Sequence, residues 1–317
     1  MFRFLAALAA FAASLAAHAS CGAAFCMVNT GWSATGVWTE PGTRFDLRYE
    51  YIDQDQPLNG KDKVSVGQVP RHHNEVETIN RNLVATLDHS FGANWGINVA
   101  VPVVDRDHIH IHQHMGQPLT ETWDFTALAD IRVLGRYQFA PRQEGDRHNV
   151  WGVNFGLKLP TGKIDERNGE GLLAERSLQP GSGSTDALLG AYFSQNLPLR
   201  NLSWFAQALY QDAIKEKDNY KPGEKFGVDL GMRYEAGERI GLMLQLNYLH
   251  KGKDSGSEAD QPDDTGGDFV FLSPGVSWNL TKEVQLYGFV QLPIYQKVNG
   301  VQIVADYALV VGMGTRF

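Results

Sequence analysis

Four histidines alternate with other residues near position 110 of the sequence: His108, His110, His112 and His114. On an extended backbone, alternate side chains lie on one side of the strand, about 6.6–7 Å apart. Neutral imidazole is a good ligand for Cu²⁺, Zn²⁺ and Ni²⁺. The run therefore indicates metal affinity, with copper or zinc as the cofactor to expect.

Neighbouring histidines of one strand are too widely spaced for all four to hold one ion. A ligand set of two of them with a residue from another segment fits a metal better. His72 and His73 lie in an early polar connection and could complete such a site. The alternative is a solvated, polar strand extension at the rim of the protein.

Residues 251–268 form a second polar segment, rich in carboxylates. Hard cations such as Ca²⁺ and Mg²⁺ prefer carboxylates and could bridge this segment to lipopolysaccharide phosphates. The segment lacks an EF-hand spacing, so a solvated surface loop is the simpler interpretation. Its acidic residues are Asp254, Glu258, Asp260, Asp263, Asp264 and Asp268.

The only two cysteines, Cys21 and Cys26, lie near the start of the chain. In an oxidising compartment an intrachain disulfide is the simplest prediction, and a metal or redox role is the alternative. No nucleophile motif such as G-x-S-x-G occurs. His89 and Ser90 are adjacent, so on a strand their side chains point to opposite sides. We therefore predict no enzyme activity.

The elements that would position these residues are strands. From Val304 to the terminal Phe317, one face carries Tyr307, Leu309, Val311 and other apolar residues, and the opposite face carries Asp, Gly and Arg. Such alternation is typical of a strand between lipid and a polar lumen. A terminal aromatic residue is also a feature of bacterial outer-membrane barrels.

Similar alternation predicts an all-β, transmembrane antiparallel β-barrel of about 12 strands, with a soluble β-sandwich as the alternative. The connections alternate between short periplasmic turns and long extracellular loops, which places the protein in the bacterial outer membrane. The long connections are 54–76, 106–125, 161–184, 213–224, 251–267 and 297–302. The predicted strands are 43–53, 77–90, 95–105, 126–139, 149–160, 185–196, 202–212, 225–236, 239–250, 268–280, 283–296 and 303–317.

Residues 1–19 have the features of a signal peptide. A basic start precedes the apolar stretch 4–17, and Ala17-His18-Ala19 is an A-x-A cleavage site. Residues 20–42 precede the first strand and would form a periplasmic segment or a lumen plug, with Trp32 and Trp38 as apolar anchors. Residues 43–317 would form the barrel.

Composition narrows the partners. The formal net charge of −8 argues against nucleic acid. No later segment is a run of about 18 apolar residues, so no transmembrane helix is expected. Outer-membrane lipid, lipopolysaccharide and a small-molecule solute are the partners we expect. The oligomeric state is not determined by the sequence.

Ionisable residues recur on the predicted inner faces of the strands. They could line a wet pore and set its selectivity. Alternatively, they could pair across a narrow lumen and seal it, since unpaired buried charges are costly. These lumen residues are Asp46, Arg48, Glu50, Asp130, Arg132, Arg136, Asp229, Arg233, Glu235, Asp306 and Arg316.

Two motifs in the middle of the chain carry a family resemblance. A strand ends in Leu159-Pro160-Thr161-Gly162, and a Gly/Ser-rich run, 178–186, ends in Asp186. Ala129-Asp130 stands where a Gly-Asp strand start is usual. This pattern resembles the outer-membrane transporter family named for the meta-pathway of phenol degradation. The resemblance implies a barrel that passes small, often hydrophobic molecules, and it carries over no catalytic residue.

We therefore predict an outer-membrane channel for passive passage of small solutes, hydrophobic or metal-linked. The alternative is a copper- or zinc-binding surface protein with a closed lumen.

Overall fold

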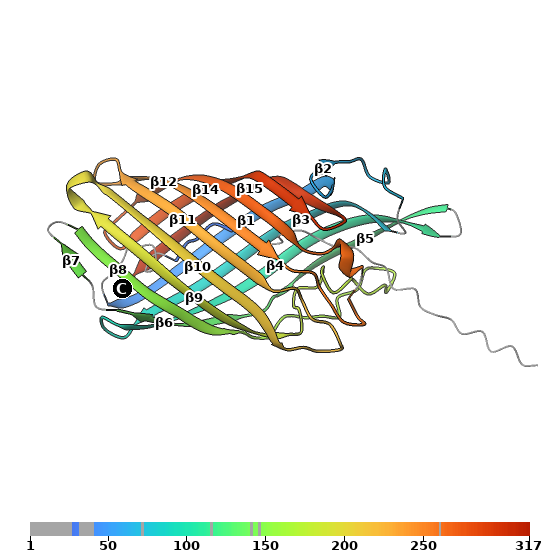
Figure 1. Cartoon of the computed structure of the whole chain (residues 1–317), viewed down its shortest axis with the longest axis horizontal. Helices are drawn as coiled ribbons and strands as arrows, with labels where there is room; N and C mark the ends of the chain where they lie inside the picture. The colour runs from blue at the N-terminus through green and yellow to red at the C-terminus, as the bar shows by residue number, and fades with distance from the viewer. Residues whose placement is uncertain are drawn as a thin grey trace, which may run out of the picture.

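The computed structural model describes residues 27–31, 41–70, 73–114, 117–139, 142–144, 147–259 and 261–317. The strands within these residues form one closed antiparallel sheet, in which β1 (Gly42–Asn59) pairs with β15 (Val301–Arg316) (Figure 1). The other long strands are β3 (His73–Ser90), β4 (Trp95–His114), β5 (Gln117–Leu128), β6 (Arg132–Gln138), β8 (Arg147–Lys158), β9 (Thr185–Leu197), β10 (Leu202–Lys215), β11 (Lys225–Glu235), β12 (Ile240–Lys251), β13 (Gly267–Asn279) and β14 (Val284–Val298).

The predicted twelve-stranded barrel is confirmed. β5 and β6 together make one barrel strand, because β4 pairs with β6 near its start and with β5 from Val103 onward. Two short strands, β2 (Asp62–Lys63) and β7 (Arg142–Glu144), lie outside the count. Two 3₁₀ turns, η1 (Pro198–Arg200) and η2 (Pro262–Asp264), lie in connections.

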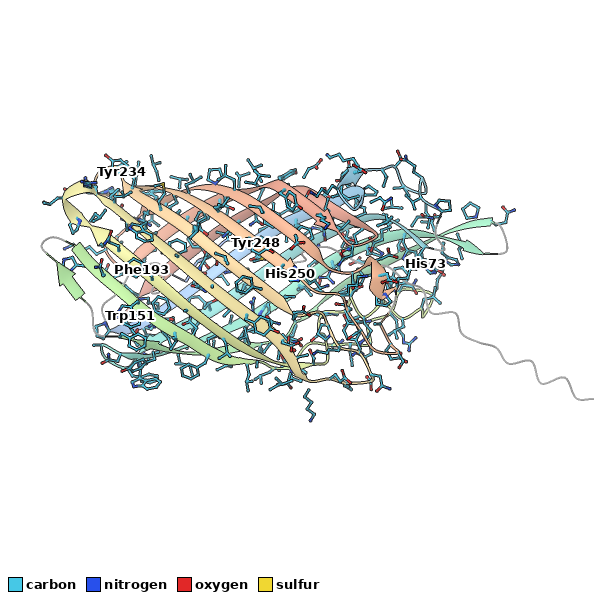
Figure 2. The ribbon with its side chains drawn as sticks, in the orientation of Figure 1. His73, Trp151, Phe193, Tyr234, Tyr248 and His250 are labelled. Atoms are coloured by element: carbon cyan, nitrogen blue, oxygen red, sulfur yellow. The ribbon has the colours of Figure 1, made fainter. Side chains whose placement is uncertain are left out.

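The outer face of the barrel is apolar, as the alternation predicts. Trp151 is 48% exposed, and the alternate residues Val153, Phe155 and Leu157 of the same strand are exposed on the same outer face. Figure 2 shows Trp151, Phe193 and Tyr234 toward one end of the barrel and His73 toward the other. An apolar outer band with aromatic residues near its edge is the surface that a bilayer requires. The fold is that of an outer-membrane β-barrel.

Among the described residues, no helix is long and apolar enough to span a membrane.

β4 and β5 extend further than predicted. Most of the expected loop 106–125 forms a hairpin, with His108 paired to Trp123 and His112 to Leu119. The prediction ended the strand where a membrane span is complete, but the alternation continues past that point. On the outer side, Arg81 binds Asp105 at 2.8 Å and Asp107 at 2.7 Å. These charges mark the end of the lipid-facing surface, so the histidines lie beyond the membrane-spanning part.

Most of the predicted lumen residues point inward. Asp46, Glu50, Asp130, Arg136 and Arg233 are buried on the inner side. Arg48 and Asp229 face the same side, because they form hydrogen bonds with Thr30 and Asn29 inside the barrel. Arg132 is half-buried and shares a face of β6 with Arg136.

Asp306 differs from the prediction. Its side chain is 58% exposed and forms an ion pair at 3.2 Å with Lys63, which is 64% exposed. The register between β1 and β15 shifts between Ile52 and Gln54, which pair with Ala308 and Ala305. This bulge breaks the alternation, so Asp306 does not continue the inner face of Ala308 and Val310.

Candidate functional site

Residues 27–31 lie inside the barrel. Asn29 donates from its backbone N–H to Gln245 (2.9 Å) and from its side-chain amide to Gln207 (3.0 Å) and Asp229 (3.1 Å). Val28 is buried in a cluster that includes Ile52, Met243 and Phe289. The described part of the segment predicted at 20–42 is therefore held in the lumen by several strands.

Charged groups on the inner face pair with neighbours on the wall. Arg48 binds Glu50 at 2.8 Å, and its guanidinium also donates to Thr30 of the inner segment at 2.7 Å. Nearer the short turns, Asp88 pairs with both Arg44 (3.1 Å) and Arg136 (3.3 Å). Pairing lowers the cost of burying these charges. The inner wall is thus polar, and these charged side chains are balanced by neighbours of opposite charge.

The wall between β14 and β15 is incompletely paired. Their ladder runs from Val284–Thr315 to Gln291–Ala308, and no further pair forms although both strands are fully described. A pocket lies at this place. Its inner side carries apolar side chains and two buried glutamines, and Tyr307 lies on the outer side. The apolar residues are Ile52, Phe269, Phe271, Val304 and Ala308, and the glutamines are Gln54 and Gln291. A largely apolar pocket therefore adjoins the place where β14 and β15 do not pair with each other, although β15 still pairs with β1 and β14 with β13 there.

The long connection between β8 and β9, residues 159–184, is here called the inward loop. Both of its ends are held by Lys158 and two carboxylates. The Lys158 ammonium contacts Asp130 at 2.8 Å and Asp186 at 3.3 Å, and it also donates to Ser182 and Ser184. The family-like motif residues thus meet in one buried network.

The same network needs a close approach of two glycines. Asp130 accepts from the backbone N–H groups of Gly162 (3.0 Å) and Ser182 (2.9 Å). A Cβ added to Gly162 would lie 2.6 Å from the Cα of Gly181. Only glycine allows this contact, so the Pro-Thr-Gly motif closes the base of the inward loop.

The middle of the inward loop packs against the inner face of the β4–β5 hairpin. Leu178 is buried with Val104, Trp123 and Phe125. The Trp123 indole N–H donates to the Leu172 carbonyl at 3.1 Å, and Arg106 donates to the Leu178 carbonyl. The hairpin and the inward loop therefore cover each other beyond the membrane.

The histidine run lies under this cover. His108, His110 and His112 are buried. The alternative of a solvated strand extension at the rim is therefore wrong for these three residues. The Thr78 hydroxyl is 2.7 Å from His108 Nδ1, and His108 Nε2 is 3.3 Å from His110 Nδ1. Burial is the largest of the effects that lower the pKa of His108 well below its usual value, and it is followed by the nearby His110 and Arg106.

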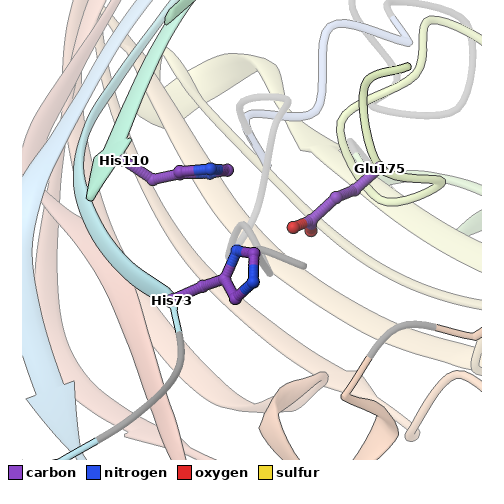
Figure 3. A group of neighbouring side chains, drawn as sticks. All are labelled: His73, His110 and Glu175. Atoms are coloured by element: carbon purple, nitrogen blue, oxygen red, sulfur yellow. The ribbon is translucent and has the colours of Figure 1, made fainter. Parts of the chain in front are cut away.

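Two carboxylates and one further histidine join the run. Glu121 of β5 lies 3.0 Å from His110 Nε2 and 3.2 Å from His112 Nδ1. The His73 ring of β3 is centred 5.2 Å from that of His110 and 5.4 Å from that of His112. Glu175 of the inward loop faces His73 and His110 (Figure 3). Neither glutamate is among the site residues predicted from the sequence. Glu121 shares the inward alternation of Trp123 and Phe125, but no local pattern marks Glu175.

The remaining predicted site residues are placed as follows. The His114 backbone pairs with Gln117 at the end of the hairpin. His72, Cys21, Cys26 and Asp260 lie outside the described residues, so the disulfide stays a prediction. In the acidic segment, Asp254 accepts from Tyr220, Asp263 pairs with Lys253, and Asp268 pairs with His250. Among the described residues, groups of three or more ligating side chains occur only at the histidine cluster.

Comparison with known proteins fixes the family. Residues 55–299 match the family described as "Putative MetA-pathway of phenol degradation". The chain belongs to this family. The predicted resemblance to the phenol-degradation family is therefore confirmed, and its motif residues are those that hold the inward loop. A search of curated proteins found no match.

Solved structures resemble this family member to different degrees, and the first of the following three shares its fold. An outer membrane channel from Pseudomonas putida F1 is 14% identical, with 92% of this chain and 100% of that chain covered and a TM-score of 0.62. NanC porin is 9% identical, with 86% and 100% covered and a TM-score of 0.46. A FadL homologue from Pseudomonas aeruginosa is 10% identical, with 90% and 92% covered and a TM-score of 0.39.

Proposed function

We propose that the protein is an outer-membrane channel for passive passage of small, mainly apolar solutes. The observation that carries the proposal is the largely apolar pocket where β14 and β15 do not pair with each other. Strand pairing seals the wall of a membrane barrel, because unpaired backbone groups in lipid are costly. A place where pairing stops and apolar side chains gather is suited to a solute that partitions between lipid and lumen.

The polar part of the lumen supports the same choice of solute. Residues 27–31 occupy it and are hydrogen-bonded to Gln207, Asp229 and Gln245. Ion pairs on the wall join Asp88 to Arg44 and Arg136, and Glu50 to Arg48. A large hydrophilic solute would have to displace these contacts, whereas a small apolar solute gains by contact with Phe269, Phe271 and Val304.

Passage would involve no covalent step and no energy source in this chain. The surroundings would be outer-membrane lipid and lipopolysaccharide, with the charged residues of the long loops in contact with the headgroups.

The test fills the pocket. Ala308 is buried at its inner side, so Ala308→Trp should obstruct it. Ala191 is exposed on the outer face of β9, so Ala191→Trp is a matched control. The measurement is the influx of a neutral naphthalene probe into Gram-negative cells that display equal amounts of each folded barrel. We expect Ala308→Trp to slow influx severalfold and Ala191→Trp to match the wild type. Equal influx through Ala308→Trp and wild type would refute the pocket as the route.

A further inference from the structure

We infer that His73, His110 and Glu175 bind a divalent transition metal, Zn²⁺ or Cu²⁺, which links the inward loop to the barrel wall. One ring nitrogen of each histidine and one carboxylate oxygen of Glu175 all lie within 4.8 Å of one another. All three side chains are buried: His73 is 3% exposed, His110 is 0% exposed and Glu175 is 3% exposed. Figure 3 shows the three side chains converging on one point.

Each ligand comes from a different element with its own support. His73 is in register with His112 across the β3–β4 ladder, and His110 lies in the same ladder opposite Glu75. The Glu175 carbonyl accepts from the backbone N–H groups of Leu178 and Gln179, both at 3.0 Å, which fixes the turn that carries it. Ligands on rigid elements bind a metal without first having to be ordered.

The donor set selects the class of metal. Two imidazoles and one carboxylate, with a position left for water or a fourth ligand, form a set that Zn²⁺ uses widely. Cu²⁺ binds such nitrogen-rich sites more tightly still. Ca²⁺ and Mg²⁺ prefer sites made of oxygen ligands. The site should therefore distinguish Zn²⁺ and Cu²⁺ from Mg²⁺.

A second layer of side chains would orient the ligands. Glu121 lies 3.0 Å from His110 and 3.2 Å from His112, and His110, His112 and Glu121 form a second group with ligand atoms within 4.8 Å. Carboxylates that hold a ligating imidazole commonly change metal affinity by on the order of 10- to 100-fold when removed. His112 and Glu121 thus extend the site along the hairpin.

The consequence for transport rests on the proposed channel function. Glu175 belongs to the inward loop, whereas His73 and His110 belong to the wall. A bound ion would add a direct link between them and hold the loop over the external mouth of the lumen. Metal would then reduce opening of the loop.

Binding is tested on untagged, refolded protein in detergent, because an affinity tag would itself hold metal. Calorimetric titration with ZnCl₂ should give one tight site, and MgCl₂ should give none. His73→Ala and Glu175→Gln should each weaken Zn²⁺ binding at least 10-fold, on the scale that ligand-orienting residues show. His89→Ala on the same strand and Glu166→Gln on the same loop are the controls and should bind as wild type. No binding, or equal binding by all five proteins, would overturn the site and leave a metal-free hydrogen-bonded cluster.

The link is tested separately by hydrogen exchange of residues 159–184. Zn²⁺ should slow exchange of this loop in the wild type and leave it unchanged in Glu175→Gln. Binding without slower exchange would overturn the link between loop and wall. Both readouts are independent of solute passage, so failure of the channel proposal would not be mistaken for failure of the metal site.

Discussion

Lys158 is the residue on which the base of the inward loop depends. Its ammonium group lies between two buried carboxylates, 2.8 Å from Asp130 and 3.3 Å from Asp186, and the three side chains are 9%, 8% and 3% exposed. Lys158→Met keeps the length of the side chain and removes the positive charge. Asp130 and Asp186 would then share a buried space without the cation that offsets their repulsion.

Removing one partner of a buried ion pair typically costs about 3–5 kcal/mol. We expect the lower end, about 3 kcal/mol, because Asp130 keeps its bonds from Gly162 and Ser182 and Asp186 keeps its bond from Gln211. Urea unfolding of the refolded barrel, followed by tryptophan fluorescence, measures this loss. Trypsin cleavage after Arg167 or Arg176 measures release of the loop.

Lys163→Met is the matched control, since Lys163 pairs with Glu166 on an exposed part of the same loop. It should leave the unfolding midpoint where it is. Lys158→Met combined with Asp130→Asn should recover part of the stability. A loss below about 1 kcal/mol in Lys158→Met, with the loop still resistant to trypsin, would refute the reasoning.

Three further results are expected. Gly162→Ala should open the base of the inward loop, because its Cβ would lie 2.6 Å from Gly181 Cα, and faster trypsin cleavage of the loop would report it. Asn29→Ala removes the two side-chain hydrogen bonds that join the inner segment to Gln207 and Asp229, and it should raise single-channel conductance in a planar bilayer; an unchanged conductance would contradict obstruction of the lumen by residues 27–31. Trp123→Phe keeps the apolar packing but loses the bond to Leu172, so exchange of loop amides should rise modestly, by the equivalent of about 1 kcal/mol.

The sequence alone predicts the barrel well because a membrane barrel repeats one rule along every strand. Lipid on one side and polar groups on the other enforce an alternation that remains visible in each segment, such as Trp151 to Leu157. The same rule fails where the environment changes. The length of a membrane span ends the predicted strand at residue 105, but the hairpin continues to His114 because the inward loop, instead of lipid, covers it.

The functional site is only half visible in the sequence for a related reason. The histidine run is local, and its spacing identifies one face of a strand. Its partner Glu175 comes from a loop whose path is set by the distant contacts of Lys158, Gly162 and Leu178. Similarly, the bulge that displaces Asp306 arises from pairing between the two ends of the chain. Neither long-range arrangement leaves a periodic pattern.

The central claim is that apolar solutes pass through this barrel in preference to charged ones. The most direct test compares the influx of a neutral naphthalene probe with that of its sulfonated analogue, in Gram-negative cells with and without the folded protein in the outer membrane. We predict that the protein accelerates influx of the neutral probe and leaves that of the sulfonated probe nearly unchanged. Equal acceleration of both probes would indicate a wet, unselective pore, and acceleration of neither would contradict a channel function.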